Sequence, residues 1–355
     1  MTYCENERVY FSSDYMEGAH PSIIEAIART NKEHCEGYGE DPHTEHAIEM
    51  IREICQAPDA YVQFLVGGTQ TNATVIDAML RGYEGVISAS SGHINVHEAG
   101  AIEFGGHRVL ALPDNRGKIN AEQIRHFMDV FEKDGARDHL VQPGMVYLSL
   151  PTEYGTLYSL EELKAISSVC DQYDLKLYID GARLAYALAS PANDITMADL
   201  ASYCDAFYIG GTKCGALFGE AVVIPDKKLL PHFFTTVKQH GALLAKGRLL
   251  GIQFEELMKD ELYMKVGKTA IGAADRIREA LRKNGYELYL ENPTNQVFTI
   301  LENSLKEKIA EQVSFGFWEI IDETHTAVRF ATSWCTKDED VDMLIKVLEK
   351  NARSN

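Results

Sequence analysis

Lys213 lies in a glycine-rich stretch that could place a single amine in a confined site. It follows the apolar run Ala206 to Ile209 and has Gly210, Gly211 and Gly215 around it. This pattern predicts a buried strand that ends in a tight turn. The lysine has two interpretations: a solvated loop residue, which is the usual fate of lysine, or a partly desolvated amine that forms a Schiff base. Taken alone, the stretch slightly favours the first interpretation.

Asp180 ends a second predicted strand and is followed by Gly181 and Arg183. In α/β sheets the ligands bind beyond the carboxyl ends of the strands, so an acid at this point faces a ligand. A pyridoxal phosphate (PLP) enzyme needs both groups, because a lysine holds the cofactor as an imine and a carboxylate keeps the pyridine nitrogen protonated. Lys213 and Asp180 together make PLP binding the leading hypothesis.

A small polar loop, Gly67 to Asn72, joins the predicted strand Tyr61 to Val66 to an apolar helix. A helix N-terminus after such a loop can bind phosphate through free N–H groups and the helix dipole. An ordinary turn between a strand and a helix has the same pattern, so the loop does not by itself indicate phosphate binding.

Two histidines and a glutamate, His93, His97 and Glu98, follow the predicted strand Gly85 to Ala89. His93 is either a partly buried histidine with satisfied hydrogen bonds or an imidazole that stacks on a cofactor or moves protons. No third metal ligand stands at a suitable spacing, so the sequence predicts no metal site.

Strands and helices alternate from residue 61 to residue 224, which predicts a mostly parallel sheet wrapped by helices. Within this region Ser159 and Glu162 form a predicted capping box, and before it Thr44 is the predicted N-cap of a helix. The further strands and helices expected are Arg108 to Leu112, Ala121 to Phe131, Met145 to Leu150, Ala221 to Ile224, Gln296 to Leu301, Ala327 to Ala331 and Asp338 to Lys350. We expect an N-terminal segment and a large α/β domain at residues 1–235 and a smaller α+β domain at residues 236–355.

Composition narrows the functional classes. The net charge of −19 disfavours a nucleic-acid or anionic-membrane surface. The seven cysteines are odd in number and form no C-x-x-C pair, which argues against a disulfide framework and a zinc site. Met1 to Asn6 lack the features of a signal peptide, and no apolar run reaches transmembrane length. The expected compartment is a reducing cytoplasm.

The chain resembles the threonine aldolase and β-eliminating lyase group of PLP enzymes, which share the aspartate aminotransferase-like fold. The resemblance extends over most of the chain and is closest to the bacterial low-specificity aldolases. The motifs that carry it are SSD at Ser12 to Asp14, YGEDP at Tyr38 to Pro42, GGTQTN at Gly67 to Asn72, GHINVHEAG at Gly92 to Gly100, TEYGTLY at Thr152 to Tyr158, SLEELKAIS at Ser159 to Ser167, LYIDGARL at Leu177 to Leu184, GGTKCG at Gly210 to Gly215 and VRFATSW at Val328 to Trp334.

The resemblance implies that Lys213 is the Schiff-base lysine and that Asp180 pairs with the pyridine nitrogen. It places His93 against the cofactor ring, where this histidine either stacks or also acts as a base. For the phosphate it implies backbone N–H groups of Gly68 and Thr69, with Thr212 also in the cofactor site. Arg248 matches a cation that reaches the phosphate across a subunit interface.

For the substrate, the resemblance implies that Ser13, Arg183 and Arg329 hold the carboxylate, and His139 matches a second active-site histidine. The implied reaction is retro-aldol cleavage of a β-hydroxy-α-amino acid of the L-threonine or L-allo-threonine type to glycine and an aldehyde. The implied assembly is a homodimer or homotetramer with active sites at the dimer interface.

Three departures from the family pattern concern the substrate side. Ser12 to Asp14 read Ser-Ser-Asp where the family often has Arg-Ser-Asp. Thr332 and Ser333 stand where the family often has Thr-His, and Pro151 to Glu153 replace a Glu-Asn-Thr region. They leave open which amino acid is native and which β-carbon configuration is preferred. β-Elimination, racemisation and transamination use the same lysine and aspartate and stay as alternatives, and a catalytically silent binding protein is a more remote one.

Overall fold

A seven-stranded sheet with the order β2-β8-β7-β6-β5-β3-β4 forms the centre of the larger domain in the computed structural model, which describes residues 8–352. The strands are β2 (Tyr61–Leu65), β3 (Glu84–Ala89), β4 (Arg108–Leu112), β5 (Gln142–Ser149), β6 (Lys176–Asp180), β7 (Ala206–Gly210) and β8 (Glu220–Ile224). Neighbouring strands are parallel except where β8 pairs antiparallel with β2 and β7. The predicted mostly parallel sheet is confirmed.

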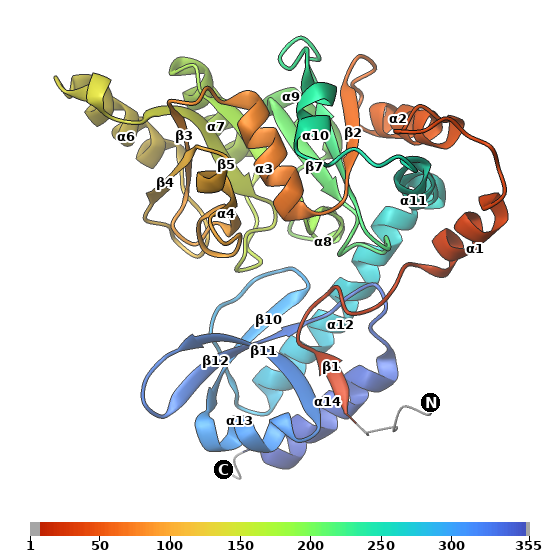
Figure 1. Ribbon diagram of the computed structural model, residues 1–355. Helices are drawn as coiled ribbons and strands as arrows, with labels where there is room; N and C mark the ends of the chain where they lie inside the picture. The colour runs from red at the N-terminus through yellow and green to blue at the C-terminus, as the bar shows by residue number, and fades with distance from the viewer. Residues whose placement is uncertain (1–7, 353–355) are drawn as a thin grey trace.

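Helices cover both faces of this sheet (Figure 1). They are α1 (Pro21–Thr30), α2 (Pro42–Ile54), α3 (Gly68–Met79), α4 (His93–Val96), α5 (Ala101–Phe104), α6 (Ala121–Lys133), α7 (Leu160–Gln172), α8 (Leu184–Ala189), α9 (Met197–Tyr203), α10 (Phe233–Gln239) and α11 (Arg248–Met258), with the 3-10 turns η1 (Arg137–His139) and η2 (Lys259–Glu261). One apolar cluster packs α3, α4, α5 and α10 on one face, and the larger cluster packs α1, α2, α6 to α9 and α11 on the other. Two packed faces hold the strand ends in fixed positions.

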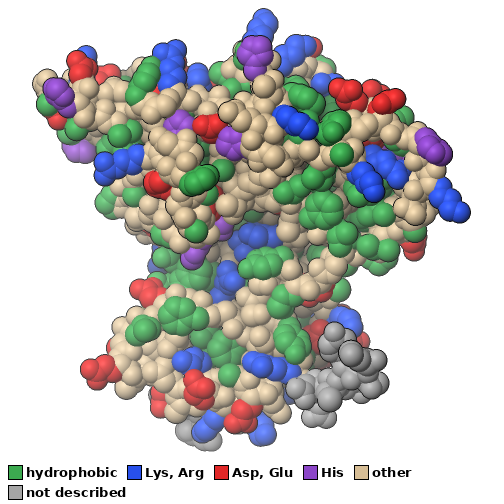
Figure 2. Space-filling model, in the orientation of Figure 1, with side chains coloured by type: hydrophobic (Ala, Val, Ile, Leu, Met, Phe, Trp, Pro, Cys, Tyr) green, Lys and Arg blue, Asp and Glu red, His purple; other side chains and the backbone are tan. Residues whose placement is uncertain are grey.

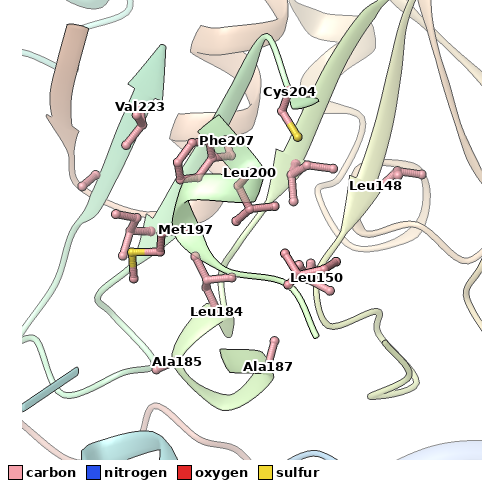
Figure 3. Packing of buried hydrophobic residues seen from close by; sticks show 14 of the residues in the cluster. Leu148, Leu150, Leu184, Ala185, Ala187, Met197, Leu200, Cys204, Phe207 and Val223 are labelled. Atoms are coloured by element: carbon pink, nitrogen blue, oxygen red, sulfur yellow. The ribbon is translucent and has the colours of Figure 1, made fainter. Parts of the chain in front are cut away.

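Part of the larger cluster lies between the central strands and two short helices (Figure 3). Phe207 on β7, Leu184 of α8 and Leu200 of α9 belong to this part, Leu148 on β5 lies at its edge in the view, and all four side chains are buried. α8 begins four residues after Asp180, so this packing fixes the loop that carries the predicted site residues Asp180 and Arg183.

The smaller domain contains a five-stranded sheet in the order β1-β11-β12-β10-β9. Its elements are β1 (Val9–Phe11), α12 (Leu262–Lys283), β9 (Glu287–Leu288), β10 (Gln296–Glu302), α13 (Asn303–Ala310), β11 (Val313–Ile320), β12 (His325–Ala331) and α14 (Asp338–Asn351). A separate apolar cluster joins this sheet to α12 and α14.

The two domains are divided differently from the expected boundary after residue 235. β1 pairs in parallel with β11, so the N-terminal segment joins the sheet of the smaller domain. α12 runs between the domains (Figure 1), with Val266 and Ala270 in the core of the larger domain and Ile277 and Leu281 in that of the smaller one. The apolar pattern of α12 is continuous, so the passage between domains leaves no mark in the local sequence.

N-terminal caps were predicted for two helices, α2 and α7, and the structure shows both helix starts. Ser159 and Glu162 form the predicted capping box at α7. The prediction of Thr44 as an N-cap was wrong, because Asp41 accepts a hydrogen bond from the Thr44 backbone N–H and α2 already begins at Pro42. Proline suits the first helical position, so the true start lies three residues earlier than predicted.

The six cysteines that the structure describes are free; Cys4 lies in residues 1–7, outside the described part, as do Met1 to Asn6. Within residues 8–352, the helices include none with the length and apolarity needed to cross a membrane. Figure 2 shows Lys, Arg and His side chains at the constriction between the two domains.

Candidate active site

A cavity of about 270 Å³ lies at the carboxyl ends of β5, β6 and β7. It brings together six residues that were predicted for the cofactor from four separate stretches of sequence: Gly68, Thr69, His93, Asp180, Thr212 and Lys213. Ligands bind at this edge of parallel sheets, because the strands point their terminal loops into a common space. The strands of the larger domain therefore assemble the predicted cofactor site.

Lys213 is held in the turn that follows β7. Its carbonyl accepts a hydrogen bond from the buried Tyr186 hydroxyl. Burial and the positive charge of Arg183 lower the pKa of Lys213, and nearby carboxylates, among them Asp14, offset this only in part. A lowered pKa leaves more of the amine neutral near pH 7, and the neutral amine is the nucleophilic form. Lys213 thus has the environment that its predicted role requires.

Asp180 is a buried carboxylate that accepts four hydrogen bonds. The Tyr147 hydroxyl (2.6 Å) and Asn72 Nδ2 (3.0 Å) donate to Oδ2, while the Tyr208 hydroxyl (2.5 Å) and the Ala182 backbone N–H (3.0 Å) donate to Oδ1. Burial alone would raise the pKa of Asp180. The charge of nearby His93 and the hydrogen bonds from side chains outweigh burial and hold this pKa below its usual value. The carboxylate is therefore kept ionised inside the protein.

His93 is linked to Asp180 through a chain of hydrogen bonds. His93 Nδ1 lies 2.8 Å from Glu98 Oε1, and Asn72 Nδ2 donates to the same Glu98 oxygen (2.7 Å) and to Asp180. The Tyr178 hydroxyl donates to Asn72 Oδ1 (2.9 Å), which fixes the amide. This chain engages one nitrogen of the His93 ring and leaves Nε2 for a ligand.

The first turn of α3 forms another wall of the cavity. Gly67 provides no side-chain cap, so the N–H groups of Gly68 and Thr69 at the start of α3 have no capping acceptor. A Cβ atom at Gly68 would lie 3.2 Å from the Tyr208 hydroxyl, a closer approach than most Cβ atoms make, so glycine leaves room beside this hydroxyl. On the opposite loop the Thr212 hydroxyl accepts the Gly219 N–H (3.0 Å). Uncapped N–H groups at a helix N-terminus suit a phosphate.

A second cavity, of about 310 Å³, adjoins the first and shares His93, Arg183 and Lys213 with it. Arg329 also lines this cavity and donates to Gln296 Oε1 (2.9 Å) and the Ser12 carbonyl (3.1 Å). Its Nε is buried and has no hydrogen-bond partner among the described residues. Two guanidinium groups that line one cavity suit a carboxylate ligand.

Three of the predicted site residues, Ser13, Arg248 and His139, line neither cavity. Ser13 lies between Ser12, whose carbonyl accepts from Arg329, and Asp14, which pairs with Arg183, but its own side chain lines neither cavity. Arg248 donates to the Thr30 carbonyl (2.8 Å) at the end of α1.

His139 is exposed in η1 and lines neither cavity, so the prediction of His139 as a substrate residue is not supported within one chain. Its match rested on a single histidine near the end of α6. The histidine that does join His93 in the second cavity is His97, with the two ring centroids 5.6 Å apart.

Sequence reasoning assigned no role to two acidic residues of the site, although it placed the segment Pro151 to Glu153 on the substrate side. Glu220 lines the first cavity and accepts the Gly211 N–H (3.0 Å), and Glu153 lines both cavities. A signal existed for Glu220, because it begins the otherwise apolar strand Glu-Ala-Val-Val-Ile, in which every residue is buried. Glu153 stands in a loop of mixed composition, where nothing in the local pattern marks it as buried.

The donor set of the first cavity fits PLP. Lys213 can hold the cofactor covalently, the ionised Asp180 can keep a pyridine nitrogen protonated, and the start of α3 at Gly68 offers N–H groups to a phosphate. The match between cavity and PLP rests on the uncapped N–H groups and on the buried carboxylate with its four hydrogen-bond donors. It does not depend on similarity to a known protein.

Comparison with known proteins agrees with this interpretation. The β-eliminating lyase family model matches residues 11–303. The low specificity L-threonine aldolase of Pseudomonas aeruginosa is 32% identical over 339 residues, which are 93% of this chain and 94% of that protein. The solved structure of Leishmania major threonine aldolase is 40% identical, with a TM-score of 0.94, and covers 97% of this chain and 100% of that chain. A mutant of Thermus thermophilus aspartate aminotransferase is 15% identical, with a TM-score of 0.72 over 97% of this chain and 91% of that one, and shares the fold.

Proposed function

Because the chain belongs to the β-eliminating lyase family, we propose that this PLP-dependent lyase cleaves β-hydroxy-α-amino acids of the L-threonine or L-allo-threonine type. The products are glycine and an aldehyde. The observation that carries the proposal is the pair of adjoining cavities, one built around Lys213 and Asp180 and the other around Arg183 and Arg329. The threonine aldolases that resemble the chain over nearly its whole length support the same reaction.

PLP, when bound, supplies an electron sink for the electron pair left on Cα when the Cα–Cβ bond breaks. The protein residues prepare the site for it. Lys213 presents an amine whose pKa burial and Arg183 have lowered, and Asp180 presents a carboxylate that its hydrogen bonds keep ionised. Gly68 and Thr69 offer backbone N–H groups to the phosphate. These contacts bind and orient the cofactor before any substrate arrives.

Arg183 and Arg329 orient the substrate. The Arg329 guanidinium lines the cavity and can bind a substrate carboxylate, and Arg183 adds a second positive charge in the same cavity. Fixing the carboxylate determines which bond at Cα is presented for cleavage, and such positioning accounts for much of the rate of a chemical step. Ser13, beside the carbonyl that holds Arg329, contributes to the same end of the site.

His93 is positioned against the cofactor site by Glu98. Its Nε2 is available either to contact the cofactor ring or to accept a proton. Replacement of His93 by asparagine separates these roles. Retained cofactor binding with little loss of rate would exclude His93 as the base.

Assembly and location form part of the proposal. We place the protein in the cytoplasm, which the free cysteines of the described residues support. We also propose a homodimer or homotetramer in which Arg248, at the start of α11, reaches the phosphate of a neighbouring subunit. Activity that declines on dilution would support the assembly, and specific activity that is constant down to monomer concentrations would contradict it.

Product analysis tests the reaction itself. Purified protein with added PLP is incubated with L-threonine or L-allo-threonine, and the products are measured. Glycine with acetaldehyde means aldol cleavage, whereas a 2-oxo acid with ammonia means β-elimination. The second result would replace the proposed reaction by its nearest alternative on the same site.

A further inference from the structure

We propose that Glu153 is a catalytic acid–base group that accepts the proton of the substrate β-hydroxyl group, an inference that rests on the proposed aldolase function. Glu153 lies in the loop after β5 and is 9% exposed. It lines the cofactor cavity, the adjoining cavity of Arg183 and Arg329, and a third, outer cavity of about 470 Å³. A carboxylate at the junction of all three spaces faces the region between cofactor and substrate.

The two hydrogen bonds that other residues donate to the Glu153 carboxylate both go to one oxygen. The His93 backbone N–H (3.0 Å) and the Ser149 hydroxyl (2.7 Å) both donate to Oε1. Among residues 8–352, no other residue donates a hydrogen bond to Oε2. This arrangement holds the group in a single orientation and leaves Oε2 able to receive a proton from a ligand.

The surroundings make Glu153 a stronger base than an exposed glutamate. Burial raises its pKa, Asp180 on β6 raises it further, and the Ser149 hydrogen bond and His93 on α4 oppose this without cancelling it. The positive charge of Arg183 at the start of α8 also lies within range of this carboxylate. A base with a raised pKa takes up a proton more readily in the transition state of a cleavage step.

The two histidines of the site are less suited to this proton transfer. His93 is tied through Glu98 and Asn72 to Asp180, so its hydrogen bonds connect it to the cofactor end of the site. His97 lines the second and third cavities but not the cofactor cavity. Glu153 is the acidic group that borders both the cofactor and the space beyond the arginines.

The proposed proton transfer and bond cleavage need no reactant other than the substrate and protons exchanged with solvent. Oε2 of Glu153 takes the hydroxyl proton, and the electron pair of the O–H bond forms the C=O bond of the departing aldehyde. The Cα–Cβ bond breaks, and its electron pair goes to Cα. Cα then takes up a proton from solvent to give glycine, and Glu153 returns its proton to solvent through the outer cavity that it lines.

Glu153→Gln tests the inference, because the amide oxygen can still accept from Ser149 and the His93 N–H but takes up no proton. We expect kcat for aldehyde release to fall by about 100-fold or more. Exchange of the glycine α-hydrogen with solvent deuterium, followed by NMR, is expected to stay within about threefold, because glycine has no β-hydroxyl group. PLP affinity, measured by absorbance titration, and the melting temperature are expected to be unchanged.

Two further variants complete the experiment. Glu153→Asp keeps a carboxylate and is expected to cleave faster than Glu153→Gln while exchanging glycine at the same rate. Glu311→Gln makes the same chemical change at an exposed residue at the end of α13 and is expected to behave as the wild type.

Three results would overturn the inference. Cleavage by Glu153→Gln within about threefold of wild type would show that Glu153 does not transfer the proton. A joint loss of cleavage, glycine exchange and PLP affinity would give Glu153 a purely structural role. A wild type that exchanges glycine hydrogen but releases no aldehyde would remove the proposed aldolase function, and the inference with it; that failure appears before any variant is made.

Discussion

Arg183 and Asp14 form a buried ion pair that ties the N-terminal segment to the larger domain at the active site. Arg183 Nε and Nη2 donate to the two Asp14 carboxylate oxygens at 2.6 and 3.0 Å, and Asp14 is 1% exposed. Asp14 follows β1, a strand of the smaller sheet, and also accepts from Asn295 Nδ2 (2.9 Å) of the smaller domain. Burial opposes the ionised form, but Arg183 and Lys213 hold the pKa of Asp14 well below its usual range.

Asp14→Asn is predicted to destabilise the protein, because it leaves the Arg183 guanidinium buried without a counter-charge. We expect a loss of about 3–5 kcal/mol in the free energy of unfolding, measured with urea. The matched control is Asp338→Asn, which removes one partner of an exposed ion pair with Arg276 and should cost less than about 1 kcal/mol. Equal losses in the two variants would contradict a special role for the Asp14 pair.

Lys213→Ala is predicted to abolish turnover, with kcat falling by more than about 10³-fold. The reason is that no other amine lines the cofactor cavity among the described residues. The absorbance band of the lysine-bound cofactor should also disappear, while PLP still binds through its phosphate and ring contacts. Steady turnover by this variant would reject the assignment of Lys213.

Asp180→Asn is predicted to weaken the electron sink while preserving the shape of the site. We expect kcat to fall by about 10²–10³-fold, comparable to the loss of one preorganised electrostatic contact. The new amide would also place an NH2 group against hydroxyls, such as that of Tyr208, that donate to Asp180. Kinetics with saturating PLP test this, and an unchanged kcat would remove Asp180 from the mechanism.

Arg329→Lys is predicted to raise KM for the amino acid by about 10-fold or more, the effect of losing one hydrogen bond to a charged group. Lysine keeps the positive charge but lacks the planar fork that reaches Gln296, the Ser12 carbonyl and a carboxylate together. PLP affinity should not change, since Arg329 lines only the second and outer cavities. If KM is unchanged and PLP affinity falls, Arg329 belongs to the cofactor site instead.

The raised pKa of Glu220 predicts that the stability of the cofactor-free protein depends on pH. Burial raises the pKa of Glu220 to about 8, and hydrogen bonds from Thr212 and Gly211 together with Lys213 only partly oppose this. Between the ordinary glutamate pKa and about 8, the native state holds more protons than the unfolded state, so stability falls as pH rises through this window.

Glu220→Gln removes this titration. Its stability relative to wild type should therefore increase from pH 5.5 to pH 8, by at most about 1.4 kcal/mol per pH unit. Melting temperatures of both proteins across this range measure the effect. A difference that is constant with pH, or that shrinks as pH rises, would contradict a raised pKa at Glu220.

The sequence predicted the parts of the site that follow strand ends. Asp180 ends β6 and Lys213 stands three residues after the end of β7, and both strands have a clear apolar pattern. The sheet then brings these strand ends together. The segment Gly67 to Asn72 was recognisable for the same reason, because its strand and helix are both local in sequence. The prediction of a loop up to Asn72 was wrong, however, since α3 already begins at Gly68.

The contacts between domains could not be predicted in this way. The ion pair of Asp14 with Arg183 joins residues 169 positions apart, and the contact of Arg329 with Ser12 joins residues 317 apart. Such pairs depend on how the smaller sheet packs over the strand ends, which no local pattern encodes. The same applies to Glu153, whose carboxylate accepts from the His93 N–H of α4 and whose carbonyl accepts from Gln296 of the smaller domain.

An absorbance and aldehyde assay on the purified protein with PLP tests the central claim most directly. The spectrum is recorded before and after glycine, and then aldehyde release is followed with L-threonine and L-allo-threonine in the same cuvette. We predict a cofactor band near the visible edge that shifts with glycine, together with aldehyde from at least one of the two hydroxy amino acids. No band after added PLP, or a band with no aldehyde from either substrate, would contradict the account.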